Sequence, residues 1–247
     1  MKKFSTLLRI EIKQSLRCPD SIIFGICMPV LILLLIGGVW GDNITEGGYT
    51  LLEGSFPSLI TVGICATAFM GIPLSIADYR EKKILKHYFV TPINPVVILF
   101  VEFVKDMIIA IISAIFVSLV AKLVFDYSMK GNIVIFILAY FLVLISMFSI
   151  GSIIASVCKN IKIANVVTSF VYFPMLFLSG AVIPFEVFPK SLRNVASILP
   201  LTQGIKLLKS CALNQSVGNI TISLSVLIIS LILGIIISLK TFKWEIV

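Results

Sequence analysis

Charged residues are scarce in this sequence. Lys, Arg, Asp and Glu make up 13% of its 247 residues, 59% are hydrophobic, and the mean hydropathy is +1.12. An ordinary soluble domain contains about 25% charged residues. One soluble core cannot bury so large an excess of apolar side chains. The composition therefore excludes an ordinary soluble domain and indicates a membrane protein.

Motifs for catalysis and metal binding are also missing. No G-x-x-x-x-G-K-[ST] loop is present to hold the phosphates of ATP. Because His87 is the only histidine, a His-Glu-x-x-His zinc pair cannot form, and a protease would need its nucleophile in the same short loop. The cysteines show no paired spacing: Cys18, Cys27, Cys65, Cys158 and Cys211. We therefore expect no disulfide framework, no metal site and no cofactor bound by this chain.

Long apolar runs are what the sequence has in abundance. A helix needs about 20 apolar residues to cross a bilayer. Runs close to that length predict helices at Ser21–Trp40, Phe56–Ile76, Pro95–Val124, Ile133–Val157, Ile163–Val182 and Ile220–Leu239. The first run lacks a small-residue cleavage site, so we interpret it as a retained helix rather than a signal peptide. The sequence therefore predicts an all-α membrane protein with six transmembrane helices.

The basic residues are unevenly distributed between these runs. Residues 1–20, 77–106, 158–162 and 240–247 hold 14 of the 20 Lys and Arg residues, whereas the loop 41–54 has none. Cytoplasmic loops retain positive charge. We therefore expect a multi-pass protein of the cytoplasmic (plasma) membrane with both termini in the cytoplasm. The formal charge of +8 reports this orientation and does not indicate a nucleic-acid partner.

The first 19 residues predict an amphipathic helix lying along the cytoplasmic interface. Arg9, Lys13 and Arg17 are spaced four apart, and the apolar residues lie largely on another side of the same helix. Pro19 would end this helix before the first span. A basic tail that only sets the topology is the alternative.

A second short helix is expected in the loop after the second run. Asp78 can cap it, with Glu81 three residues on as in a capping box, and Pro92 and Pro95 would stop it. Its apolar stripe includes Ile84, Leu85 and Tyr88. Such a stripe would rest on lipid or on a partner protein. A basic loop that only sets the orientation is the alternative.

The connection after the fifth run is interrupted by helix breakers. Gly180, Pro184, Pro189 and Pro200 preclude one continuous helix. The pieces between them are too apolar for a solvated loop and too short to span the membrane, so we expect half-helices that re-enter the outer leaflet over residues 180–202. A surface loop with an amphipathic helix at 191–199 is the alternative.

These last two segments resemble the signatures of the ABC-2-type permeases, the membrane subunits of ATP-binding-cassette exporters. The matching stretches are 79–87 (Tyr-Arg-Glu-Lys-Lys-Ile-Leu-Lys-His) with 90–92, and 177–202. The order and spacing of the other spans resemble the family too. Many members carry Glu-x-Gly-Thr-Leu where this chain has Glu-Lys-Lys-Ile-Leu at 81–85, a variant that resembles small drug exporters.

The resemblance implies a single membrane domain, 1–247, with an elbow helix at 1–19, a coupling helix at 78–92 and an external re-entrant segment at 180–202. It implies that the coupling helix docks on a separate ATPase subunit, which binds ATP and Mg. The docking residues that it implies are Glu81, Ile84, Leu85, His87, Tyr88, Phe89, Thr91 and Pro92. It also implies a second permease subunit, identical or not, with spans two and five facing the dimer axis. The candidate path residues are then Thr61, Cys65, Phe69, Tyr172, Phe173, Met175 and Phe177.

The expected function is that of the permease subunit of an ATP-driven exporter for an amphiphilic small molecule, drug or peptide-like substrate. Two alternatives remain open. The same scaffold serves exporters of polysaccharides or lipid-linked polymers. An ATP-independent channel or ion-coupled transporter would instead use Glu102 and Asp106 near the start of the third span. Because Lys105 can pair with Glu102, the sequence favours an interfacial salt-bridge cluster there over an ion site.

Overall fold

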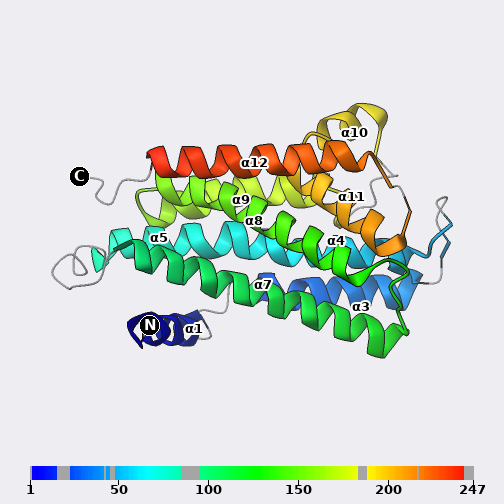
Figure 1. Ribbon diagram of the computed structural model, residues 1–247, viewed down its shortest axis with the longest axis horizontal. Helices are drawn as coiled ribbons and strands as arrows, with labels where there is room; N and C mark the ends of the chain where they lie inside the picture. Colours follow the sequence, from blue (N-terminus) through cyan, green and yellow to red (C-terminus); the bar gives the residue numbers. More distant parts are fainter. Residues whose placement is uncertain are drawn as a thin grey trace.

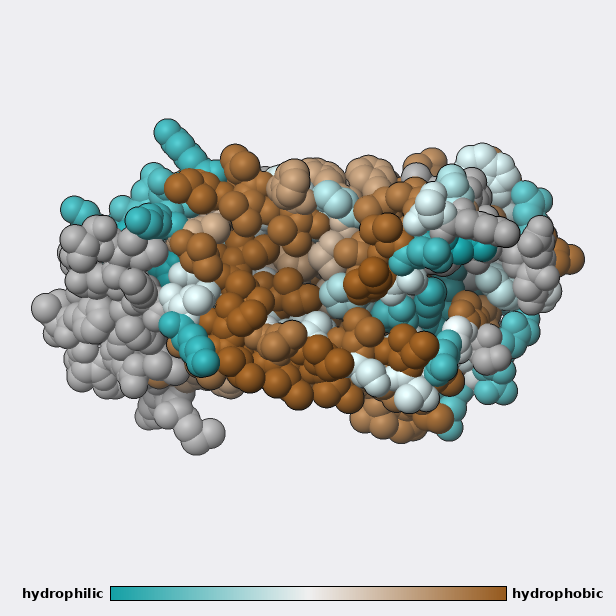
Figure 2. All heavy atoms as spheres, turned by 90° about the horizontal axis from the view of Figure 1, so that it is seen from above, coloured by the Kyte–Doolittle hydropathy of each residue, from teal (hydrophilic) through white to brown (hydrophobic). Residues whose placement is uncertain are grey.

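The computed structural model describes residues 2–15, 23–41, 43–44, 48–84, 95–182, 188–215 and 217–241. In these ranges six helices are long and apolar enough to cross a membrane: Ile23–Trp40, Leu51–Glu81, Val97–Phe125, Ile133–Val157, Ile161–Leu178 and Ile220–Thr241. They run along the long axis of the molecule (Figure 1). On the face drawn in Figure 2, apolar residues cover the middle and hydrophilic residues gather toward the two ends. The predicted six-helix, all-α architecture is confirmed.

The two ends of the bundle carry different shorter helices (Figure 1). At one end, here the α1 end, α1 (Lys2–Ser15) packs on α7 (Pro95–Phe125), and α12 (Ile220–Thr241) finishes. At the other, the α11 end, lie α10 (Lys190–Ala196) and α11 (Pro200–Leu213). The fourth span is α8 (Ile133–Val157), and the fifth is α9 (Ile161–Leu178).

The second span occupies the centre. It consists of α4 (Leu51–Ala66), the π-helical turn η2 (Thr67–Gly71) and α5 (Ile72–Glu81). In its most apolar stretch 83% of the residues are buried, against 17% in the first and sixth spans. It packs against α3, α7, α8, α9 and α11, which places it at the centre of the bundle.

Proline explains both π-helical turns. The turn η1 (Ile23–Cys27) precedes α3 (Met28–Trp40), and Pro29 of α3 has no N–H to donate to the carbonyl of Gly25. Pro73, at the start of α5, likewise has no N–H to donate to a carbonyl of η2. The hydroxyl of Ser113 on α7 donates to the freed Gly25 carbonyl. A hydroxyl from a neighbouring helix thus satisfies a backbone group that proline leaves open in the apolar interior.

Small residues let α12 approach α8 closely. The hydroxyls of Ser146 and Ser230 lie 2.6 Å apart, and Ser149 donates to the Ser230 carbonyl at 3.3 Å. A Cβ added at Gly234 would lie 2.7 Å from the Cβ of Ser149. Only glycine therefore fits at position 234, and these contacts pack α12 within its own subunit.

Several predicted boundaries were wrong. The second span begins at Leu51 rather than Phe56, because Thr50 and Glu53 form a capping box there. No helix begins at Asp78. It lies in the last turn of α5, and its carboxylate pairs with Lys82 at 2.8 Å instead of capping.

At the other end of the bundle, two more boundaries differ. The fifth span ends at Leu178 instead of Val182, because Gly180 adopts a left-handed conformation with φ of +83°. The helical structure expected over 180–202 continues as α11 to Leu213, where Asn214 ends it with φ of +52°.

Candidate functional site

The last turn of α5 holds the junction between the fourth and fifth spans. A guanidinium nitrogen of Arg80 donates to the carbonyl oxygens of Ala155 and Cys158, at 2.5 and 2.6 Å, where α8 ends. The carboxylate of Glu81 accepts from the backbone N–H of Ile161, at 3.0 Å, where α9 begins. A cation at a helix C-terminus and an anion at a helix N-terminus both match the helix dipole. We call this pair the α5 clamp.

The predicted docking segment begins directly after the clamp. Helix α5 ends at Glu81, and Lys83, with φ of +55°, turns the chain. Ile84 packs on a small buried cluster of Tyr79 and Ile98. The other predicted docking residues, Leu85, His87, Tyr88, Phe89, Thr91 and Pro92, lie outside the described residues. Glu81, one of the predicted docking residues, thus contacts α9 of its own chain.

A buried polar cluster joins α1, α5 and α7. The Tyr79 hydroxyl of α5 lies 2.5 Å from a Glu11 carboxyl oxygen of α1 and 2.7 Å from one of Glu102 in α7. The hydroxyl has one proton and can donate to only one of them, so the other carboxyl must be protonated and donate in return. The Lys105 ammonium contacts the Glu102 carboxylate, as predicted.

The members of this cluster on α7 are buried inside the subunit. Glu102 and Asp106 have no exposed surface, and Lys105 is 4% exposed, because α1 and α5 cover them. Asp106 lies 3.5 Å from the Lys105 ammonium and makes no hydrogen bond within the described part of the chain. Its carboxyl group rests on Gly71 of η2, where a Cβ would lie 2.6 Å from Asp106 Cγ. The π-helical turn and its glycine thus make room for a buried carboxyl group.

Glu11 is the member of the cluster that lies outside the spans. Burial, reinforced by the negative charge of Glu102, raises the pKa of Glu11 to about 7. Next to it lies a cavity of about 290 Å³, which Glu11 and Asp106 line together with Ser75. The α1 helix is therefore attached to the bundle through a carboxyl group that titrates near neutral pH.

The candidate path residues separate into two groups. Thr61, Cys65 and Phe69 are fully buried in the second span, and Tyr172 and Met175 are buried on α9. Phe173 and Phe177 are exposed (39% and 47%), and their rings stack at 6.4 Å. The described part of the chain therefore brings five of the seven together inside one subunit and leaves two on its surface.

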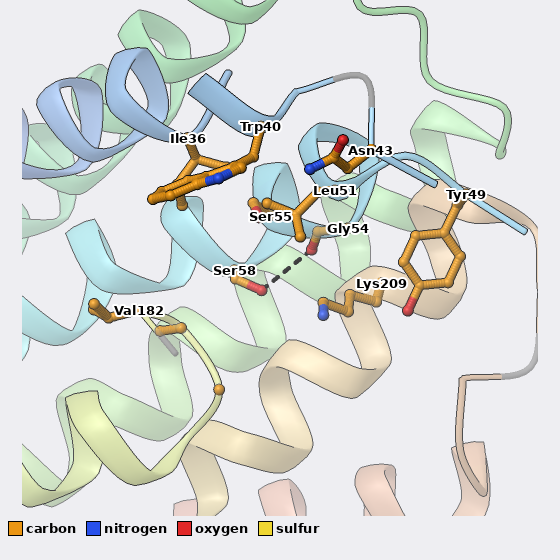
Figure 3. A pocket seen from close by; sticks show the side chains of 12 residues that line it. Ile36, Trp40, Asn43, Tyr49, Leu51, Gly54, Ser55, Ser58, Val182 and Lys209 are labelled. Carbon is orange, nitrogen blue, oxygen red and sulfur yellow. Dashed lines mark hydrogen bonds between the residues drawn. The ribbon is translucent and has the colours of Figure 1, made fainter. Parts of the chain in front are cut away.

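A pocket of about 320 Å³ lies at the α11 end, between α3, α4, α11 and the turn after α9 (Figure 3). Ile36 and Trp40 form an apolar side. Lys209 of α11, which is 8% exposed, extends into the pocket toward Ser58 (Figure 3). Gly180 contributes its left-handed turn to the wall. The lining of the pocket thus includes an indole ring and one ammonium group, a combination suited to amphiphilic molecules.

One of the predicted helix breakers lines this pocket, and two others begin or precede helices at the same end of the bundle. Gly180 lines it, Pro200 is the first residue of α11, and Pro189 precedes α10. Pro184 lies outside the described residues. Gln203 of α11 binds two neighbours, donating to the Ser197 carbonyl at 2.5 Å and accepting from Ser223 of α12 at 2.8 Å.

Comparison with known proteins adds an independent finding. The profile of the ABC-2 type transporter family matches residues 2–213. The chain belongs to the ABC-2 type transporter family. It is also similar to Nodulation protein J of Rhizobium leguminosarum bv. viciae, with 30% identity over 90 residues, and to Nodulation protein J of Neorhizobium galegae, with 28% over 95 residues. These matches cover 36% and 38% of this chain, and 35% and 36% of the relatives.

Sequence reasoning missed several residues of this ABC-2 permease. Arg80 was not singled out, although an arginine just before a turn between two spans is a signal for helix capping. Glu11 and Tyr79 were missed because their contact joins segments 68 residues apart. Lys209 was counted only as a charge on the outer side, although a lysine within an apolar segment such as 200–213 is itself a signal.

Proposed function

We propose that this ABC-2 permease is the membrane subunit of an ATP-driven exporter that moves amphiphilic small molecules out of the cell. ABC-2 permeases pair with an ABC ATPase subunit, and this sequence has no phosphate-binding loop of its own. The observation that carries the proposal is the α5 clamp. It connects the chain segment that would meet the ATPase to the fourth and fifth spans of the bundle.

The clamp suggests how the subunits are coupled. When two ATPase subunits close on ATP, they displace the segment 82–94 that continues from α5. Arg80 then moves the end of α8, and Glu81 moves the start of α9, as one body. Because packed helices shift between discrete arrangements rather than deform continuously, a small displacement at the α1 end is transmitted along α9.

The exposed side of α9 is the surface that we assign to the second permease subunit. Val166, Phe170, Phe173 and Phe177 lie along it, and Phe170 is 80% exposed. Their spacing of three or four residues places them on one stripe of the helix. Rotation of α9 against a second copy would open a path between this stripe and the buried residues Cys65 and Tyr172. A cysteine at Phe170, in a variant without the native cysteines, should then cross-link two copies.

The substrate class follows from the pocket in Figure 3. A molecule that leaves along α9 would meet a pocket lined by Trp40 and Lys209. The apolar part of an amphiphile can pack on the Trp40 ring, and an anionic or hydrogen-bond-accepting head can contact the Lys209 ammonium. The apolar lining favours this class over a hydrophilic polymer.

The orientation is part of the same proposal. The α1 end carries Arg80, Lys159 and Lys162, which supports a cytoplasmic location for this end. An impermeant thiol reagent should label Ile44→Cys in intact cells, because Ile44 is 76% exposed at the α11 end. Lys159→Cys should react only after the membrane is opened. Labelling of position 159 from outside would overturn the orientation.

Transport itself tests the proposal. The permease is co-purified with its ATPase, identified by mass spectrometry, and both are assayed in inside-out vesicles with a fluorescent amphiphilic dye. We expect dye uptake that requires ATP and stops when the phosphate-loop lysine of the ATPase is replaced. Uptake without ATP would refute the exporter, and stimulation of ATP hydrolysis by a polysaccharide alone would refute the substrate class.

A further inference from the structure

A crevice between α7 and α8 lies near the α11 end and has a volume of about 690 Å³. Both helices pack on α4, which contributes the buried side chains of Phe56 and Ile60. Ile115 of α7 and Ile137 of α8 stand at the sides of the crevice and are 52% and 46% exposed. The crevice is therefore apolar and opens toward the lipid.

The crevice has the depth of one membrane leaflet. Its side on α7 extends from Ile111 to Lys122, which is about 16 Å at 1.5 Å per helical residue. The hydrocarbon core of a bilayer is about 30 Å thick, so each leaflet contributes about 15 Å. An acyl chain of one leaflet thus matches the crevice in length.

Two tyrosines that line the crevice have buried hydroxyls with no hydrogen-bond partner among the described residues. They are Tyr140 of α8 and Tyr127 of the α7–α8 connection. Tyr140 is only 6% exposed, and a buried hydroxyl without a partner is costly. Helical side chains lean toward the helix N-terminus, which for α8 lies at the α11 end. Tyr140 lies about two turns from the start of α8, within the half of the helix that lines the crevice.

The mouth of the crevice carries a cation. Lys122 is exposed there and forms no ion pair within the described ranges. Nearby charges are already balanced or face solvent, since Lys130 pairs with Glu53 at 2.7 Å and Asp126 is exposed. A lysine at the end of a span extends its ammonium group to the headgroup region. A phosphate group of a lipid would meet it at that level.

We propose that the crevice between α7 and α8 binds one membrane phospholipid. One acyl chain lies against Phe56 and Ile60, an ester carbonyl accepts a hydrogen bond from Tyr140, and the phosphate pairs with Lys122. The site is separate from the α5 clamp and from the pocket of Figure 3. Lipid binding there requires neither the ATPase nor the transported substrate. The test of this site is therefore independent of the proposed function.

Native mass spectrometry of the detergent-purified permease tests this site. The probes are dioleoyl phosphatidylglycerol and dioleoylglycerol, which has the same chains and esters but no phosphate. We expect one phosphatidylglycerol to remain bound and dioleoylglycerol to be lost. Lys122→Gln and Tyr140→Phe should each raise the apparent Kd about fivefold, the change that corresponds to one ordinary hydrogen bond.

A blocking variant and two matched controls complete the test. Ala114 lines the crevice, so Ala114→Phe should abolish retention by filling it. Ile232→Phe on the lipid-exposed side of α12, and Lys159→Gln at the α1 end, should leave retention unchanged. Equal retention of both lipids, or an unchanged Kd in Lys122→Gln, would overturn the proposal. Because Lys122 is exposed, its variant provides the result even where Ala114→Phe does not fold.

Discussion

Replacement of Arg80 should uncouple ATP hydrolysis from transport. Its two hydrogen bonds, at 2.5 and 2.6 Å, are donated by one charged nitrogen to carbonyls at the end of α8. A hydrogen bond from a charged group contributes about 1.5–3 kcal/mol. Two bonds that share a donor are not additive, so Arg80→Ala should cost about 3 kcal/mol at the junction. That shifts the equilibrium between the joined and separated states of α5 and α8 by about two orders of magnitude.

The assay measures three quantities on the reconstituted complex: ATPase binding, substrate-stimulated ATP hydrolysis and dye uptake. In Arg80→Ala the ATPase should still bind, because the segment that follows residue 81 is unchanged. Uptake per ATP should fall at least tenfold. Arg80→Lys should lie between the two proteins, since an ammonium keeps the charge but lacks the planar fork of donors.

Lys159→Gln is the control for loss of a positive charge at the same junction, because Lys159 is exposed beside Cys158. It should couple normally. Thermal unfolding in detergent separates an uncoupled protein from an unfolded one. A folded Arg80→Ala protein with an unchanged ratio of uptake to hydrolysis would refute the role of the α5 clamp.

Three further predictions concern other parts of the chain. Gly71→Ala should destabilise the bundle by about 1–3 kcal/mol, because the added Cβ would lie 2.6 Å from Asp106 Cγ. The control is Gly38→Ala, which should not lower the unfolding temperature because no atom lies within 4 Å of its added Cβ. The attachment of α1 should be strongest at acidic pH and weaken as the pH rises through about 7, because Glu11 has a raised pKa and binds a proton more tightly when docked. Hydrogen exchange of residues 2–15, corrected for its intrinsic pH dependence, should show this, and Glu11→Gln should remove it. Gly180→Leu should impair uptake without loss of ATPase binding, since φ of +83° is unfavourable for leucine; normal uptake by that variant would contradict a role for the pocket.

The spans were predictable because they depend on local properties. An apolar run of sufficient length spans a bilayer whatever its neighbours, so five of the six predicted helices begin or end within two residues of the observed bounds at one end or both. The second span was longer than predicted at both ends. At its start, the capping box of Thr50 and Glu53 could have been recognised from the sequence. At its end, the Asp78 pattern resembled a helix start, but α5 continues through it.

Tertiary contacts explain the residues that sequence reasoning misplaced. The burial of Glu102 and Asp106 was not predicted, because nothing in residues 95–106 indicates that α1 would cover them. Arg80 binds carbonyls that lie 75 and 78 residues along the chain. The contact of the Glu81 carboxylate with the backbone N–H of Ile161 was not predicted either, because it joins residues 80 positions apart. Contacts of this kind depend on which helix ends meet, and hydrophobic periodicity does not encode that.

The polar contacts at the α1 end divide the bundle into two connected units. Arg80 and Glu81 tie α5 to α8 and α9, while Tyr79, one residue earlier, ties α5 to α1 and α7 through Glu11 and Glu102. Three successive side chains on one helical turn therefore contact four different helices, α1, α7, α8 and α9. In the proposed coupling, a displacement of the chain that follows Glu81 would act on both units. At the turn 79–81, force on the 82–94 segment would thus be divided between two pairs of helices, α1 with α7 and α8 with α9. Substitutions in this turn should therefore affect both the coupling to ATP hydrolysis and the pH dependence of α1 attachment.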